Sequence, residues 1–334
     1  MPIPELSIII CHHAGSLILR CLKSLETAKG NFECIIVTSM REFSYQGSGI
    51  TLIYADGGPA YKRNLGASSA SGKYLVFLDD DVEIREDCLI NFQAFLESKP
   101  ACGMAFAKIL KMDRRDVFDD CGSWLTWTGF LWSRAGNDQI DRKQYDDPIP
   151  ILASKSATCI ISKQVFSHVG QFDEEMYILG EETDLAWRCW HAGYQVWYVP
   201  SAVSWHAFGT SLKPPAEYYK PDRIYKYGPR NYITLLYKNL GATRLLLTLP
   251  IHLFGWLCAA TIMALTGRRS FSILILLGIW ENIANFKRLH AKRKIVQAAR
   301  KVSDWQLSKF IYSSPPPSYY LARLIRYRTT GLHG

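Results

Sequence analysis

The stretch Lys-Tyr-Leu-Val-Phe-Leu-Asp-Asp-Asp-Val-Glu-Ile, residues 73–84, decides the fold class of this chain. Residues 74–78 are aromatic, β-branched or otherwise apolar, and this short run predicts a buried strand of a sheet that is covered on both faces. The strand ends in Asp79, Asp80 and Asp81, and the carboxyl ends of strands in open α/β sheets line the crevice that binds ligands. Three adjacent negative charges repel one another unless a cation meets them, and oxygen ligands favour Mg²⁺ or Mn²⁺. The stretch therefore predicts a metal site, with a solvated acidic turn as the alternative.

Strands and helices alternate on both sides of this stretch. Pro59 stands in the predicted first turn of a helix, and Pro200 is expected to close the last strand because proline has no N–H for the ladder. The alternation predicts an α/β fold with a parallel or mixed sheet. The other predicted strands are residues 6–11, 32–37, 50–54, 103–110, 157–161 and 195–199, and helices are predicted at 17–25, 59–71, 85–98 and after residue 180.

Charge is divided unevenly along the chain. The first 214 residues carry 20 Lys and Arg against 26 Asp and Glu, a net charge of −6, whereas the remainder carries 19 against 4, a net charge of +15. We therefore predict two domains, residues 1–214 and 215–334. A basic domain can face nucleic acid or an anionic membrane. We expect no nucleic-acid partner here, because the basic residues flank long uncharged stretches.

The basic domain contains a stretch that is long enough to cross a membrane. Residues 245–267 hold no formal charge and would form a helix of roughly 34 Å. Residues 270–280 are apolar but too short to span alone, whereas residues 287–301 predict a basic helix and residues 319–328 an interfacial helix. These patterns predict membrane association, with a soluble helical domain around a buried central helix as the alternative.

The expected location is the cytoplasmic face of the cell membrane. A single span would place its two basic flanks on opposite sides, against the positive-inside tendency, so we expect a hairpin or an in-plane attachment. The nine cysteines show no pairing pattern and no zinc spacing, which is typical of a reduced compartment.

A second acidic cluster lies in residues 180–188. Helical spacing places Glu181, Asp184 and Arg188 on one face, where ion pairs can form. Glu182 projects elsewhere from the first turn, where the helix N-terminus is expected to keep its carboxylate ionised and able to act as a base. A helix start that merely carries several acids is the alternative.

Aromatic side chains gather in a less regular stretch between residues 112 and 150. Trp124, Trp127, Phe130 and Trp132 either pack inside the protein or offer a platform on which an acceptor sugar stacks. Trp124 is our candidate for such an acceptor-side platform.

Separated motifs together resemble glycosyltransferase family 2, the inverting enzymes with a GT-A fold. The motifs are residues 58–66 (Gly-Pro-Ala-Tyr-Lys-Arg-Asn-Leu-Gly), 77–81 (Phe-Leu-Asp-Asp-Asp) and 180–188, followed by Pro200 and His206. The chain looks closest to bacterial members that add rhamnose, galactofuranose or similar sugars to lipid-linked glycans. The resemblance spans roughly residues 4–210 and implies a Rossmann-like mixed sheet. It also implies a nucleotide-diphospho-sugar donor, a lipid-linked glycan acceptor and a Mn²⁺ or Mg²⁺ cofactor.

The resemblance also implies roles on the donor side. Asp79 and Asp81 match the Asp-x-Asp element, which contacts the donor ribose and the metal on the diphosphate, with Asp80 between them. His206 matches a histidine that completes the metal site in some members. Arg63 and Asn64 match a segment that lines the donor pocket, which completes this set of six residues.

On the acceptor side, Glu182 stands where the family has its catalytic base, usually an Asp. Asp184 and Arg188 match positions that shape the acceptor side or brace the helix. A base of this kind removes the proton of the acceptor hydroxyl, while a divalent ion stabilises the departing nucleoside diphosphate. One carboxylate base without a second nucleophile fits single displacement with inversion.

Two departures from the family pattern surround the nucleobase pocket. Residues 37–40 (Val-Thr-Ser-Met) lack the Asp that usually reads the base, and residues 11–13 (Cys-His-His) replace a Thr-Tyr-Asn-like turn. The identity of the base therefore stays open. A non-catalytic sugar-nucleotide-binding protein is one alternative, and a nucleotidyltransferase is another, although the basic loop that the latter should carry near its first strand is absent.

Overall fold

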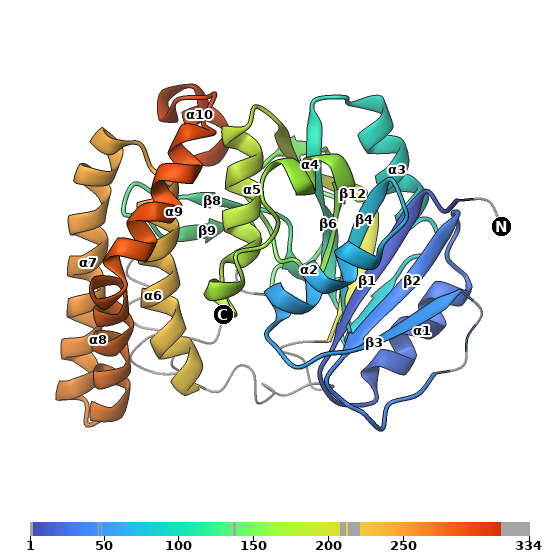
Figure 1. Cartoon of the computed structure of the whole chain (residues 1–334), viewed down its shortest axis with the longest axis horizontal. Coiled ribbons are helices and arrows are strands. Elements are labelled where there is room, and N and C mark those ends of the chain that lie inside the picture. The colour runs from blue at the N-terminus through green and yellow to red at the C-terminus, as the bar shows by residue number, and fades with distance from the viewer. Residues whose placement is uncertain are drawn as a thin grey trace. The chain divides into compact units, whose positions relative to one another are not determined.

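The computed structural model describes residues 3–45, 47, 49–135, 138–207, 212 and 221–314. By its contacts the chain divides into two units (Figure 1). The first unit is Met1–Ser123 with Ser133–Pro214, and the second is Trp124–Trp132 with Pro215–Gly334. This division differs from the predicted domains in the segment Trp124–Trp132, which belongs with the basic part of the chain.

A mixed ten-stranded sheet forms the framework of the first unit. Its strands are β1 (Leu6–His12), β2 (Phe32–Thr38), β3 (Ile50–Tyr54), β4 (Tyr74–Asp79), β5 (Val82–Ile84), β6 (Cys102–Lys111), β7 (Phe118–Asp120), β10 (Ile149–Pro150), β11 (Thr158–Ser162) and β12 (Gln195–His206). Their order is β10-β12-β6-β11-β4-β1-β2-β3, with β5 paired to β12 and β7 to β6. Strands β3, β2, β1 and β4 are parallel, whereas β11 is antiparallel to β4 and β6. The predicted parallel or mixed sheet is thus confirmed in its mixed form.

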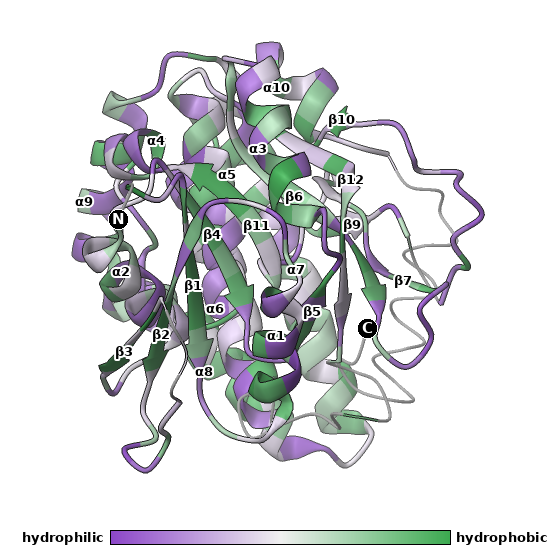
Figure 2. Ribbon diagram, turned by 90° about the vertical axis from the view of Figure 1, so that its right-hand side faces the viewer, coloured by the Kyte–Doolittle hydropathy of each residue, from purple (hydrophilic) through white to green (hydrophobic). Residues whose placement is uncertain are grey.

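Helices cover both faces of this sheet. They are α1 (Leu17–Glu26), α2 (Pro59–Ser69), α3 (Cys88–Ser98), α4 (Lys163–His168) and α5 (Glu181–His191), with a short 3-10 helix, η1 (Glu174–Met176). Ile8 and Ile10 of β1 share a buried core with residues of α1 and α3. Ile9 faces the opposite side, where a Cβ at Gly66 of α2 would lie 2.5 Å from the Ile9 Cγ2 atom. Glycine at this position lets α2 lie directly on the strand, and Figure 2 shows β1 and β4 in the green of hydrophobic residues.

Strand β12 is longer than predicted, because Pro200 does not end it. The register of β12 against β6 shifts between Val199 and Val203, so Pro200 lies in a bulge, where its missing N–H is tolerated. The strand continues to His206, which pairs with Val82 of β5. The bulge therefore carries His206 to the residue that follows Asp81.

The second unit is helical. It contains α6 (Pro221–Asn239), α7 (Ala242–Leu265), α8 (Arg269–Ala284), α9 (Phe286–Ala298) and α10 (Asp304–Ile311). The strands β8 (Ser123–Leu125) and β9 (Leu131–Ser133) form a two-stranded sheet, and all of their residues except Ser123 and Ser133 belong to this unit. Helix α6 is not predicted by the sequence patterns, since Gly228 and Pro229 stand inside it. In the described part of the chain, α7 alone is long and apolar enough to cross a membrane by length and composition. The interfacial helix predicted at residues 319–328 lies outside the described residues.

The segment Trp124–Trp132 is tied to α7 inside the second unit. Trp256 Nε1 donates to His252 Nε2 at 2.9 Å, so the other ring nitrogen of His252 donates to the Thr128 carbonyl at 3.0 Å. Both His252 and Trp256 are buried, and Trp256 belongs to the core that α7 shares with Tyr225 of α6 and Ile275 of α8.

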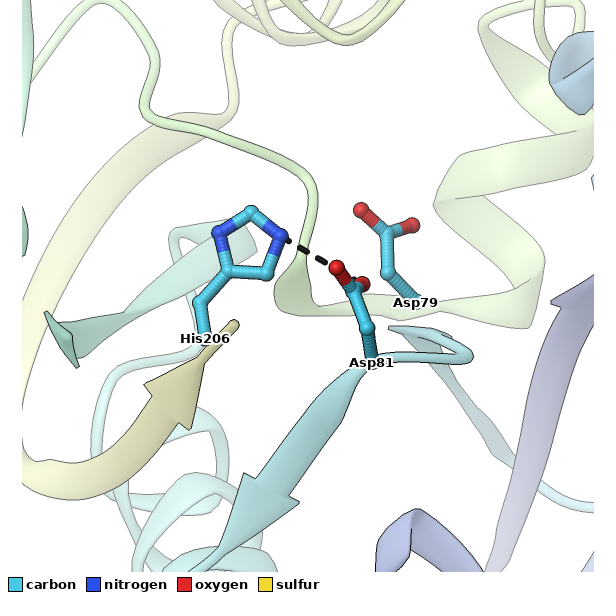
Figure 3. Close-up of side chains that lie close together, drawn as sticks. All are labelled: Asp79, Asp81 and His206. Atoms are coloured by element: carbon cyan, nitrogen blue, oxygen red, sulfur yellow. Dashed lines mark ion pairs between the residues drawn. The ribbon is translucent and has the colours of Figure 1, made fainter. Parts of the chain in front are cut away.

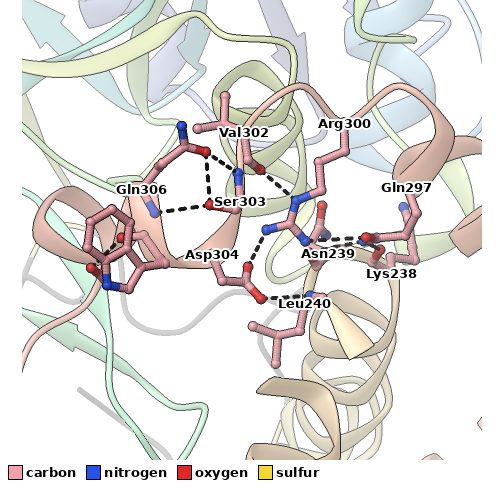
Figure 4. A network of polar contacts seen from close by, with 12 residues as sticks. Lys238, Asn239, Leu240, Gln297, Arg300, Val302, Ser303, Asp304 and Gln306 are labelled. Carbon is pink, nitrogen blue, oxygen red and sulfur yellow. Dashed lines mark hydrogen bonds and ion pairs between the residues drawn. The ribbon is translucent and has the colours of Figure 1, made fainter. Parts of the chain in front are cut away.

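Polar contacts fix the end of the described helices (Figure 4). Ser303 and Gln306 form a capping box at the start of α10. Asp304 accepts from the backbone N–H of Gly241 at 2.8 Å and from Arg300 at 2.6 Å. Helix α10 is thereby attached to the turn between α6 and α7.

Candidate active site

Three side chains converge at the carboxyl edge of the sheet (Figure 3). Asp79 ends β4, Asp81 follows it, and His206 ends β12; one ligand atom from each lies within 4.8 Å of the others. Asp81 Oδ1 and His206 Nε2 are 3.4 Å apart. Two carboxylate oxygens and one imidazole nitrogen suit a divalent cation of the Mg²⁺ and Mn²⁺ class. His206, which lies more than 120 positions after the two aspartates in the sequence, thus joins them in an arrangement that fits a metal ion.

His206 is held from its other side by residues that sequence reasoning did not identify. Its Nδ1 atom lies 2.9 Å from Asp119 Oδ2, and Lys155 Nζ lies 2.6 Å from Asp119 Oδ1. Burial opposes the charge on the imidazole, but Asp81 and Asp119 outweigh it and raise the pKa of His206 to about 10. Burial also opposes the charge on Asp119, yet Lys155 and His206 hold the pKa of that carboxyl well below its usual range.

Arg63 joins the metal-site strand to the helix that carries the second acidic cluster. Its guanidinium donates to Asp79 Oδ1 at 2.8 Å and to Glu181 Oε1 at 3.0 Å, and its side chain is only 4% exposed. Burial lowers the pKa of Arg63, but Asp79 and Glu181 more than compensate and raise it. The donor-pocket candidate Arg63 therefore reaches the site as a bridge between two carboxylates.

Glu182 is the second residue of α5, and the helix begins after Gly180, whose φ of 90° favours glycine. Burial and the neighbouring Glu181 raise the pKa of Glu182 to about 8, although its own backbone N–H acts in the opposite direction. The expectation that the helix N-terminus keeps this carboxylate ionised is therefore wrong, since burial and like-charge repulsion outweigh it. A carboxyl group that titrates near the working pH is well matched to general-base chemistry.

Asp184 and Arg188 lie in the interior rather than on an open surface. Asp184 is fully buried and accepts from Arg188 Nε at 2.9 Å. The Arg188 guanidinium also donates to the carbonyls of Val169 and Gln171. Of the two roles that the resemblance allows, this geometry corresponds to bracing the helix.

The candidates Asn64 and Asp80 hold loops beside the metal site. Asn64 Nδ2 donates to the Phe172 carbonyl and to Glu174, and Asn64 Oδ1 accepts from the Phe172 N–H at 3.0 Å. Asp80 accepts from the backbone N–H of His13 at 3.1 Å.

Trp124, the candidate acceptor-side platform, belongs to the second unit, whereas the other candidate site residues belong to the first unit. Its ring packs against Trp132 with 5.9 Å between the ring centroids.

A buried polar cluster occupies the carboxyl ends of β1 and β2. His12 Nδ1 lies 3.1 Å from Thr38 Oγ1, and Lys62 Nζ donates to the His12 carbonyl at 3.0 Å and to Ser39 Oγ at 3.1 Å. Lys62 is 2% exposed, and burial lowers its pKa. Its position on α2 carried no sequence signal for this contact, because the partners come from other parts of the chain.

The mixed α/β sheet of the first unit matches the GT-A fold of solved transferase structures. Two solved structures share the fold. GalNAc-T7 with UDP, GalNAc and Mn²⁺ aligns with a TM-score of 0.51 at 16% identity, over 70% of this chain and 51% of that chain. S. aureus TarS aligns with a TM-score of 0.50 at 16% identity, over 75% of this chain and 43% of that chain.

Residues 7–154 match the family model described as Glycosyl transferase family 2, so the resemblance is confirmed over this part of the chain. Human polypeptide N-acetylgalactosaminyltransferase 6 is 30% identical over 166 residues, which are 44% of this chain and 26% of that protein. The dTDP-rhamnosyl transferase RfbF of Shigella flexneri is 25% identical over 171 residues, 49% of this chain and 54% of that protein. The chain thus spans about a quarter to a half of the length of these relatives.

Proposed function

We propose that this protein is a metal-dependent, inverting glycosyltransferase that moves a sugar from a nucleotide-diphospho-sugar to an acceptor hydroxyl. The observation that carries the proposal is the convergence of Asp79, Asp81 and His206 at the sheet edge. The mixed oxygen and nitrogen ligands favour Mn²⁺ over Mg²⁺, which prefers oxygen ligands alone. A bound cation of this kind would neutralise the charge that develops on the leaving diphosphate.

Glu182 is the proposed general base. It takes the proton of the acceptor hydroxyl while the acceptor oxygen bonds to the anomeric carbon. The bond from that carbon to the diphosphate oxygen breaks, and its electron pair leaves with the nucleoside diphosphate. Glu181 is buried and engaged by Arg63, which supports Glu182 as the one carboxylate that acts on the acceptor. One base and one displacement invert the configuration.

The proposed acceptor is a lipid-linked glycan at the cytoplasmic face of the cell membrane. Support comes from the second unit, where α7 and α8 expose large apolar side chains. Basic residues of α9, among them Lys287, Arg288 and Lys294, are exposed beside Phe286 and Ile295. Apolar side chains next to Lys and Arg are typical of a helix that lies in the membrane interface. Because α7 and α8 also bury one side against their own unit, in-plane attachment is the form that we favour over a spanning hairpin. The exposed apolar residues of α7 and α8 are Leu246, Leu247, Ile251, Phe254, Leu257, Leu265, Ile273, Leu276, Leu277, Trp280 and Ile283.

A thermal-shift screen tests the donor side. The intact protein is heated with each common nucleoside diphosphate in the presence of Mn²⁺, and one of them should raise the unfolding temperature because it binds the native state. The Asp81→Ala variant should lose this shift. Asp138→Asn is the matched control, since Asp138 is half exposed and pairs with Lys111 and Arg114 at the surface. A protein that none of the nucleotides stabilises would contradict the proposal.

A further inference from the structure

His206 is held between two carboxylates, Asp81 in the turn between β4 and β5 and Asp119 in β7. Its Nε2 atom faces Asp81 Oδ1 at 3.4 Å, and its Nδ1 atom faces Asp119 Oδ2 at 2.9 Å. All three side chains are at most 6% exposed. Asp119 is therefore not a member of the three-residue ligand cluster, but it fixes the orientation of the one imidazole in that cluster.

The backbone explains how Asp119 reaches the ring. In the pairing of β7 with β6, Phe118 is opposite Leu110 and Asp120 is opposite Ile109, so Asp119 is the extra residue of a bulge. Such bulges redirect a side chain next to active sites. Without the bulge, Asp119 would pair with a residue of β6, and its side chain would point in a different direction.

Lys155 completes a chain of contacts behind the ring. Its Nζ atom lies 2.6 Å from Asp119 Oδ1, while Oδ2 of the same carboxylate faces His206. An ionised carboxylate only accepts hydrogen bonds, so Nδ1 of His206 must donate. A cation beside Asp81 that displaces the Nε2 proton would then take the lone pair of that nitrogen, the arrangement of a carboxylate–histidine–metal triad.

We propose that Asp119 is a positioning residue of the metal site, which sets the His206 tautomer and ring direction, and that Lys155 fixes Asp119 for this task. The inference deepens the proposed function, on which it rests only in taking Asp79, Asp81 and His206 as metal ligands. The role assigned to Asp119 involves no contact between Asp119 and the substrate.

The test is Mn²⁺ binding to the intact protein, followed by the electron paramagnetic resonance signal of free Mn²⁺. Asp119→Ala should weaken Mn²⁺ binding by about 10- to 100-fold, the usual effect of losing such a partner. Asp119→Asn keeps an oxygen that can accept from Nδ1 and should lie between Asp119→Ala and the natural protein. Lys155→Met should weaken binding by a few-fold, and Asp138→Asn should not change it.

A double variant separates positioning from general damage. If Asp119 acts only through His206, Asp119→Ala with His206→Ala should bind Mn²⁺ no more weakly than His206→Ala alone. Pulsed measurements should show nitrogen coupling to Mn²⁺ in the natural protein and its loss or change in Asp119→Ala. If Asp119→Ala does not fold, Asp119→Asn and its double variant carry the same comparison.

Unchanged Mn²⁺ affinity in both Asp119 variants would overturn the inference, and so would a double variant in which the losses add. A natural protein that binds no Mn²⁺ would also overturn it. Because metal binding is measured without a sugar donor, an absence of sugar transfer would contradict the proposed function and leave this result standing.

Discussion

At the scale of single residues, the chemistry depends on Glu182. Its carboxyl group shares the start of α5 with Glu181, which Arg63 engages. Glu182→Gln keeps the size and polarity of the side chain but removes the base. We expect this variant to bind nucleoside diphosphate and Mn²⁺ normally and to lose transfer by about 100-fold or more. Titration calorimetry and initial rates measure the two effects, and turnover within a few-fold of the natural protein would assign the base elsewhere, with Asp184 as the next candidate.

The pH dependence of transfer follows from the same pair. Burial and Glu181 raise the pKa of Glu182 to about 8, so the base is mostly protonated at neutral pH and becomes active as the pH rises. The rate should therefore increase through that pKa and then level off. Glu181→Gln removes the like charge and keeps an oxygen for Arg63, so the rise should move to lower pH. If the rate of Glu181→Gln rises over the same pH range as that of the natural protein, Glu181 does not raise the pKa of the base.

Sequence reasoning reached some of these residues and not others. Asp79, Asp81 and His206 stand in recognisable motifs, so they could be named before the fold was known. Asp119 and Lys155 stand in no motif, and only the bulge in β7 brings one of them to His206. The protonation of Glu182 was predicted in the wrong direction, because the helix N-terminus is visible in a sequence whereas burial is not.

At the scale of elements, Arg63 links the end of β4 to the start of α5. Arg63→Met would leave the carboxylates of Asp79 and Glu181 without their shared cation in a mostly buried setting. We expect the free energy of unfolding to fall by about 3 kcal/mol, the lower end for a broken buried pair, since Asp79 is 29% exposed. Urea denaturation measures this.

The matched control is Arg114→Met, in which a half-exposed arginine loses its contact with Asp138. Exposed pairs of this kind contribute about 0–1 kcal/mol. Equal losses in the two variants would show that Arg63 has no special structural role.

Element boundaries show where local rules fail. Proline predicts the end of a strand or helix, yet Pro200 lies in a bulge within β12 and Pro229 lies inside α6. In both places tertiary packing outweighs the local preference. The apolar runs of β1, β2 and β4 were predicted almost to the residue, because strands buried on both faces leave an unbroken apolar pattern.

At the scale of the whole molecule, the proposed attachment combines burial and charge. We expect the intact protein to sediment with anionic vesicles and to resist extraction by high salt, since apolar burial is not screened. Replacing Phe254, Leu257, Ile273 and Trp280 with serine should make the protein extractable by high salt. Because these side chains are exposed, the substitutions should leave the core intact. Glutamine at Lys287, Arg288 and Lys294 should weaken capture by about 1 kcal/mol per charge without making the bound protein extractable. Complete release of the natural protein by salt would contradict in-plane burial.

The second unit is built from two separate parts of the chain, and this affects both the synthesis and the truncation of the protein. Trp124–Trp132 leaves the ribosome more than a hundred residues before the helix that carries His252 and Trp256. During synthesis this aromatic segment stays exposed until α7 has been made, and a chaperone could bind the segment during that interval. A fragment ending at Pro214 would keep the segment and lose its cover, so we expect the fragment to aggregate where the intact chain does not. Light scattering of the two proteins measures this, and a fragment that stays monomeric would show that the segment finds other cover.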